Sequence, residues 1–154
     1  MKITDITINL IEGPKTKDAE QFVGGASKII LRIDTDEGIY GISEGGRNYY
    51  LYKAYLDEII KPLLVGLDPR NPKMIWEILT HGTGPGLATK IIPQVVGTID
   101  VALWDLSGKA AGLPVYKLLG GAARTEIPLY WSRGSGWRKT PDEMLNDVKL
   151  GYEK

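Results

Sequence analysis

Apolar and polar residues alternate along the opening part of the chain. Residues 6–10 alternate isoleucine or leucine with threonine or asparagine, which is the period of a half-buried strand. In the run 29–33, Ile29, Leu31 and Ile33 form one face of a second strand. A turn at residues 36–38 (Asp-Glu-Gly) separates it from a return strand over 39–44. The pattern therefore predicts two or three antiparallel strands, with a long polar loop between the first and second.

Beyond residue 46 the apolar period becomes that of helices. Leu51, Tyr55, Ile59 and Leu63 recur at every fourth position, and Pro62 is expected to end or kink this helix. Three more helices are predicted: one capped by Asn71-Pro72 and running through 79, a long one around 92–106 that ends before Gly112, and a short one over 114–119.

The pattern changes again after residue 121. Residues 127–131 are typical of a buried strand, and Thr140–Glu143 is a capping box that begins a last helix. The apolar face of that helix is formed by Met144, Leu145 and Val148. A strand followed by a helix needs a further parallel strand, and none follows before Lys154. We expect two parts, residues 1–121 and 122–154.

The composition excludes several classes of protein. The 154 residues carry 19 basic and 19 acidic side chains, which gives no basic surface for nucleic acid. The absence of cysteine excludes disulfides, thiolate nucleophiles and cysteine-type zinc sites. No apolar run is long enough for a signal peptide or a membrane span. We expect a cytoplasmic protein that binds neither nucleic acid nor membranes.

Two short motifs favour structural roles. Residues 41–45 match the G-x-S-x-G elbow of serine hydrolases, but Ser43 falls in a predicted antiparallel strand, not at a strand-to-helix turn. The glycine-rich stretch 82–86 fits neither of the phosphate-binding glycine motifs and is interpreted as a connector between helices. His81, the only histidine, is interpreted as an exposed residue at the edge of that connector.

Two aspartates lie in the middle of the long predicted helix. Asp100 and Asp105 are five residues apart, which places their carboxylates about 140° apart around the helix axis. Ligands on one helix need a spacing of three or four residues, so these two cannot bind one ion unaided. Asp105 can instead pair with Lys109 four residues on. We interpret both aspartates as packing groups.

The same helix carries a family likeness. Ile99-Asp100, Ala102–Leu106, Gly108-Lys109, Gly112, Pro114-Val115 and Leu118–Gly121 resemble the signature of the mandelate racemase/muconate lactonizing enzyme family of the enolase superfamily. Val95 and Thr98 are milder departures from it, at positions where the pattern has small residues. The stretch ILRIDTDEGIYGISEGG resembles the second and third strands of that family, so the likeness covers nearly the whole chain.

The resemblance implies an α+β fold, with an antiparallel three-stranded meander followed by a helical bundle as in the enolase-type capping domain. It implies that residues 122–154 are the first strand and helix of a truncated TIM-like barrel. The chemistry that it implies is abstraction of the proton α to a carboxylate, with Mg²⁺ as cofactor. The lysine bases and metal ligands of the family come from later barrel strands. No catalytic or metal-binding residue is therefore assigned, and this chain alone is expected to bind no metal and to be inactive.

The resemblance also points to the residues that would contact substrate. The polar loop 15–23 corresponds to the mobile specificity loop of the family, residues 47–50 resemble its second capping loop, and residues after the strand 127–131 face the same cavity. The Trp131–Arg138 loop is also a place where barrels put their chemistry, and Arg133 or Arg138 could meet a carboxylate, with solvated loop charges as the alternative. The candidate substrate-binding residues are Thr16, Lys17, Asp18, Glu20, Gln21, Phe22, Arg47, Tyr49, Ser132 and Arg133.

The polar character of the loop favours an acid sugar as the substrate, since a purely apolar substrate would favour an apolar lid. We therefore expect the N-terminal portion of an acid-sugar dehydratase that forms a homo-oligomer. Two alternatives stay open. One is a racemase, epimerase or cycloisomerase of the same family, and the other is a standalone, non-catalytic binding or oligomerisation domain.

Overall fold

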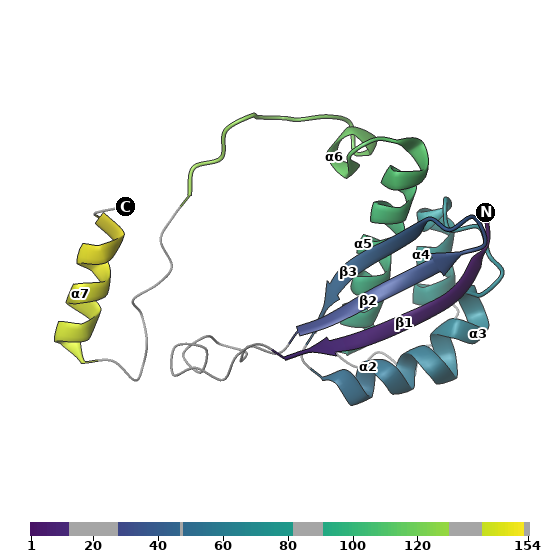
Figure 1. The fold of residues 1–154 in the computed structure, drawn as a ribbon, viewed down its shortest axis with the longest axis horizontal. Coiled ribbons are helices and arrows are strands. Elements are labelled where there is room, and N and C mark those ends of the chain that lie inside the picture. The colour runs from purple at the N-terminus through teal and green to yellow at the C-terminus, as the bar shows by residue number, and fades with distance from the viewer. Residues whose placement is uncertain (13–27, 47, 82–90, 130–139, 153–154) are drawn as a thin grey trace. The chain divides into compact units, whose positions relative to one another are not determined.

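The computed structural model describes residues 1–12, 28–46, 48–81, 91–129 and 140–152 (Figure 1). The chain divides into two compact units, Met1–Gly121 and Ala122–Lys154. In chain order the elements are β1 (Ile3–Ile11), β2 (Lys28–Thr35), β3 (Tyr40–Gly45), α2 (Tyr49–Tyr55), the π-helix η1 (Leu56–Ile60), α3 (Lys61–Leu64), α4 (Pro72–His81), α5 (Ile91–Ala111), α6 (Val115–Leu118) and α7 (Pro141–Tyr152).

The first unit is built on a three-stranded antiparallel sheet in the order β1-β2-β3. Ile33 pairs with Ile6 on one side and with Gly41 on the other, so these residues share one face of the sheet. The turn between β2 and β3 contains Gly38 at a φ of 77°, a left-handed conformation that glycine adopts without strain. The predicted antiparallel meander is confirmed.

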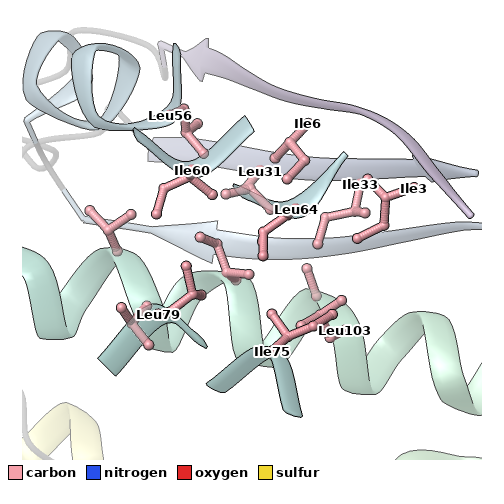
Figure 2. Packing of buried hydrophobic residues seen from close by; sticks show 14 of the residues in the cluster. Ile3, Ile6, Leu31, Ile33, Leu56, Ile60, Leu64, Ile75, Leu79 and Leu103 are labelled. Atoms are coloured by element: carbon pink, nitrogen blue, oxygen red, sulfur yellow. The ribbon is translucent and has the colours of Figure 1, made fainter. Parts of the chain in front are cut away.

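Helices cover one face of this sheet. Helix α5 packs along β3 and β2, whereas α2 and α3 lie against β1 (Figure 1). The predicted strand face of Ile29, Leu31 and Ile33 is fully buried between the layers. Figure 2 shows side chains from β1, β2, η1, α3, α4 and α5 meeting in one cluster. Each buried aliphatic side chain of this kind contributes roughly 1.5–3 kcal/mol, so the core between sheet and helices stabilises this unit.

The helix after β3 differs from the expectation by one residue. The fully buried positions are Tyr52, Leu56, Ile60 and Leu64, not the stripe one residue earlier. Pro62 does not end the helix, because a π turn precedes it in which the N–H of Lys61 reaches the carbonyl of Leu56. A proline cannot donate to the carbonyl four residues back and its ring clashes there, and the wider turn relieves both problems.

The second unit corrects one prediction. Among its described residues, 127–129 form no strand, and Ile127 and Leu129 are 72% and 92% exposed. The buried strand predicted over 127–131 is therefore wrong for the described part, because no strand described here pairs with it; residues 130 and 131 lie outside the described ranges. Helix α7 begins as predicted, with Thr140 and Glu143 in reciprocal hydrogen bonds. Its apolar residues are exposed: Met144, Leu145, Val148 and Leu150.

Candidate functional site

The candidate substrate-binding residues fall mainly outside the described ranges. This holds for residues 16–22, Arg47 and residues 132–133, and also for Arg138 and the glycine-rich connector 82–86. Of the ten candidates, the structure describes Tyr49. What it does describe is the framework from which two of the predicted loops depart.

The attachment points of those two loops lie at one end of the sheet. Ile11, the last residue of β1, pairs with Lys28, the first residue of β2. The next residue of β2, Ile29, pairs with Gly45, the last residue of β3. The polar loop after β1 and the segment between β3 and α2 therefore start from neighbouring strand ends. The exposed pair Lys28–Glu44 joins β2 to β3 at the same end.

Tyr49 and Tyr50 begin α2 at this end of the sheet. Asn48 caps the helix by accepting a hydrogen bond on its side chain from the N–H of Leu51, at 3.3 Å. Tyr49 is partly buried against the core, whereas Tyr50 is 83% exposed. The two rings meet edge to face, with 5.6 Å between their centroids. Of the two tyrosines, Tyr50 offers the larger free aromatic surface, which the sequence pattern did not distinguish.

Ser43 has a structural role, as the sequence indicated. It lies in β3, is buried, and donates a hydrogen bond to the backbone carbonyl of Thr98 on α5, at 2.7 Å. The hydrolase elbow requires an exposed hydroxyl on a sharp turn, so the G-x-S-x-G match is incidental.

Asp105 joins α5 to the exposed edge of β3. Its carboxylate accepts the backbone N–H of Ile42 at 2.8 Å and pairs with Lys109 at 2.6 Å, as predicted from the four-residue spacing. Lys109 also donates to the backbone carbonyl of Tyr40, at 3.0 Å. These bonds satisfy backbone groups on an edge strand that would otherwise be open to pairing.

Asp100 lies on the same helix and forms no ion pair with any of the residues that the structure describes. Burial raises the pKa of its carboxyl group, and a hydrogen bond with Trp104 opposes that rise. Asp100 and Asp105 thus have different surroundings and different partners. The structure supports the interpretation of both as packing groups.

The described residues offer no metal centre. No group of three or more histidine, cysteine, aspartate or glutamate side chains that could hold an ion occurs within the described ranges. The family resemblance assigns the magnesium ligands to later barrel strands and not to these residues. Within the same ranges, no helix has both the length and the apolarity needed to cross a membrane.

Tyr52 is a residue of this region that sequence reasoning missed. It is 2% exposed, and its hydroxyl accepts a hydrogen bond from the N–H of Gly46 at 2.9 Å. The signal was available, because Tyr52, Leu56, Ile60 and Leu64 also recur at every fourth position. A tyrosine in a buried stripe needs a partner for its hydroxyl, and that partner here is the segment leaving β3.

Comparison with known proteins identifies the family. The model of the mandelate racemase/muconate lactonizing enzyme N-terminal domain matches residues 7–120. A D-mannonate dehydratase of Novosphingobium aromaticivorans is 35% identical over 137 residues, which are 84% of this chain and 33% of that protein. A D-galactonate dehydratase family member of Oceanicola granulosus is 34% identical over 148 residues, 90% of this chain and 35% of that protein. The chain spans about a third of the length of these relatives.

Solved structures give the same result. An enolase of Agrobacterium radiobacter, crystallised with sodium and L-malate, superposes with a TM-score of 0.65 at 30% identity, covering 80% of this chain and 29% of its own. The 3,6-anhydro-D-galactonate cycloisomerase of Zobellia galactanivorans gives a TM-score of 0.67 at 28% identity, covering 80% and 33%. The sheet and the helices that cover it are thus arranged as in these known structures. The chain belongs to the mandelate racemase/muconate lactonizing enzyme family, whose N-terminal domain it contains.

Proposed function

We propose that this chain is the substrate-recognising N-terminal portion of a larger, magnesium-dependent acid-sugar dehydratase. The observation that carries the proposal is the similarity, over most of the chain, to dehydratases of D-mannonate and of the D-galactonate dehydratase family. The polar composition of residues 15–21 supports it, because lysine, aspartate, glutamate and glutamine side chains can hydrogen-bond a polyhydroxylated acid.

In this proposal the chain binds and orients the substrate and takes no part in proton transfer. The loops that carry Lys17, Gln21 and Arg47 depart from the shared end of β1, β2 and β3, and α2 begins there with Tyr49. In this proposal these four residues contact one ligand. The base and the ligands of the magnesium ion come from a barrel that follows this chain. The enzyme works as a homo-oligomer.

In this proposal residues 122–154 become the first strand and helix of that barrel only when the neighbouring barrel strands are present, since residues 127–129 form no strand in this chain. Their apolar residues support it, since Ile127, Leu129 and the leucines of α7 are exposed in this chain. Neighbouring strands and helices of a barrel would cover such side chains. Ser132 and Arg133 would then follow a barrel strand at its carboxyl end, where barrel enzymes bind their substrates.

An isomerase of the same family is the second candidate. The similarity to a cycloisomerase that acts on an anhydro sugar acid favours it specifically. Both reactions begin with loss of the proton α to the carboxylate and differ in what leaves afterwards. The products separate them, because dehydration releases one water and leaves a keto acid, whereas isomerisation conserves the mass.

The decisive experiment uses the protein that includes this chain followed by the rest of its reading frame. It is incubated with D-mannonate and D-galactonate, with and without Mg²⁺, and the products are identified by mass spectrometry. Magnesium-dependent loss of water supports the proposal. Products of unchanged mass establish the isomerase instead. A reading frame that ends at residue 154 would leave only the non-catalytic domain.

A further inference from the structure

A buried chain of hydrogen bonds lies beside the shared end of the sheet. The phenol oxygen of Tyr52 lies 2.9 Å from the nitrogen of Gly46 and 3.3 Å from the hydroxyl oxygen of Thr98. Tyr52 and Thr98 are both buried. The chain thus crosses from the end of β3, through α2, to α5.

The direction of these bonds follows from counting hydrogens. The hydroxyl of Thr98 donates its one hydrogen to the backbone carbonyl of Gln94, at 2.8 Å. Tyr52 must therefore donate to Thr98, and its phenol oxygen accepts the N–H of Gly46. Each donor has one acceptor, and aligned bonds of this kind strengthen one another. The position of Gly46 is thereby tied to the core.

Tyr52 also forms a hydrogen bond with Asn48, the residue that follows position 47. Its backbone N–H donates to the carbonyl of Asn48 at 3.0 Å, in the first turn of α2. Contact around its ring is close: a Cβ added to Gly46 would lie 3.0 Å from the phenol oxygen, and one added to Gly45 would lie 3.2 Å from the ring. One buried residue therefore binds the chain at Gly46 and again at Asn48.

We propose that Tyr52 is a positioning residue that holds the entry to α2, and with it Tyr49 and Tyr50, in the orientation that meets the substrate. This inference rests on the proposed function. Tyr52 does not touch the ligand itself, because it is buried beneath the helix entry. Its hydroxyl acts through Gly46, and its backbone acts through Asn48.

The test compares Tyr52→Phe with Ser43→Ala. The first variant keeps the ring and removes the bond to Gly46. The control removes a bond to the carbonyl of Thr98 in the same buried region and leaves Gly46 held. In the 154-residue chain, we expect Tyr52→Phe to accelerate hydrogen exchange at the amide of Gly46 and at the amides of residues 51 and 52, which bond to Asn48, measured by NMR, whereas Ser43→Ala leaves those rates unchanged.

In the full-length enzyme, Tyr52→Phe should raise KM for the acid sugar about two- to twelve-fold, the factor that one neutral hydrogen bond represents, with kcat little changed. Gly46→Ala pushes the phenol aside by a different route and should reproduce both results, which keeps the test valid if Tyr52→Phe folds poorly. Equal effects of Tyr52→Phe and Ser43→Ala, or unchanged exchange at Gly46, would overturn the inference. If the wild-type enzyme turns over no acid sugar, the proposed function is refuted, and so is the claim that Tyr52 orients residues toward such a substrate. The hydrogen-exchange rates would still decide whether Tyr52 holds the helix entry.

Discussion

At the scale of single residues, the two aspartates of α5 show how one residue type serves two purposes. Asp105 accepts a hydrogen bond from a backbone N–H of β3 and forms an ion pair with Lys109, so its carboxylate has two partners. Asp100 has a raised pKa because burial disfavours its charged form. The five-residue spacing was enough to predict that the two do not act together. The four-residue spacing also predicted Lys109 as a partner of Asp105, but not the backbone N–H of Ile42, since that contact depends on how α5 lies against β3.

The raised pKa of Asp100 predicts that removing its charge makes the protein more stable, by an amount that depends on pH. A folded-state pKa above the unfolded value means that ionisation weakens folding as pH rises through about 4, the ordinary aspartate value. Asp100→Asn should therefore raise the melting temperature at pH 7, and the gain should vanish in acid below that value.

Asp57 provides a control, because removing its charge should have the opposite effect on stability. Hydrogen bonds from Lys53 and Lys61 lower the pKa of its carboxyl group, so its ionised form favours folding at neutral pH and this contribution is lost in acid. Asp57→Asn should lower the melting temperature at pH 7. A lower melting temperature for Asp100→Asn at that pH would contradict the account of its burial.

At the scale of elements, the close contact between α5 and β3 determines the fold of the first unit. A Cβ added to Gly41 would lie 2.0 Å from the backbone carbonyl oxygen of Ala102 and 2.9 Å from the Cβ of Leu106. Only glycine allows this approach. Two hydrogen bonds depend on this contact because both span it: the one that Asp105 accepts from β3 and the one that Lys109 donates to β3.

Two glycine variants test this contact. Gly41→Ala forces α5 away from β3 and should cost about 3 kcal/mol or more in the free energy of unfolding. Gly97, within α5, has nothing within 4 Å of an added Cβ, so Gly97→Ala should stabilise the protein by about 0.5–1 kcal/mol. Urea unfolding measures both. Equal stability of the two variants would show that the helix is not pressed against the strand.

The elements were largely predictable, and the misses have physical reasons. Periodicity found the strands, α4, α5 and α6, because each has one apolar face and a glycine or proline near an end. It chose the wrong face of α2 because two stripes of similar hydrophobicity run side by side, and packing selects the one that starts at Tyr52. It predicted a buried strand at 127–131 from the apolar pattern of that segment, although a strand forms only beside a partner.

At the scale of the whole molecule, the structure describes the strand ends from which two of the candidate loops depart, but only one of the ten candidate substrate-binding residues. Sheet register predicts that two loops start from one end, and this follows from the described strands. The conformations of residues 16–22, Arg47 and residues 132–133 cannot be inferred from apolar periodicity, because most of these residues are polar. Their assignment to substrate binding therefore remains a prediction.

The isolated chain should not respond to magnesium. Because the family resemblance assigns the magnesium ligands to later barrel strands, millimolar Mg²⁺ should leave the melting temperature unchanged, and a chelator should have no effect. The chain alone should also dehydrate no acid sugar. A rise in melting temperature that saturates with Mg²⁺, or turnover with contaminating enzyme excluded, would show that the metal site lies within these residues.

The central claim is that this chain recognises the substrate and leaves the chemistry to the barrel. The most direct measurement compares the full-length enzyme with its Lys17→Ala/Gln21→Ala variant, following both kcat/KM for the acid sugar and solvent-deuterium exchange at the α-carbon. Each lost hydrogen bond is worth roughly 0.5–1.5 kcal/mol, so kcat/KM should fall several-fold while exchange at saturating substrate persists. Unchanged kinetics, or loss of exchange together with turnover, would contradict the claim.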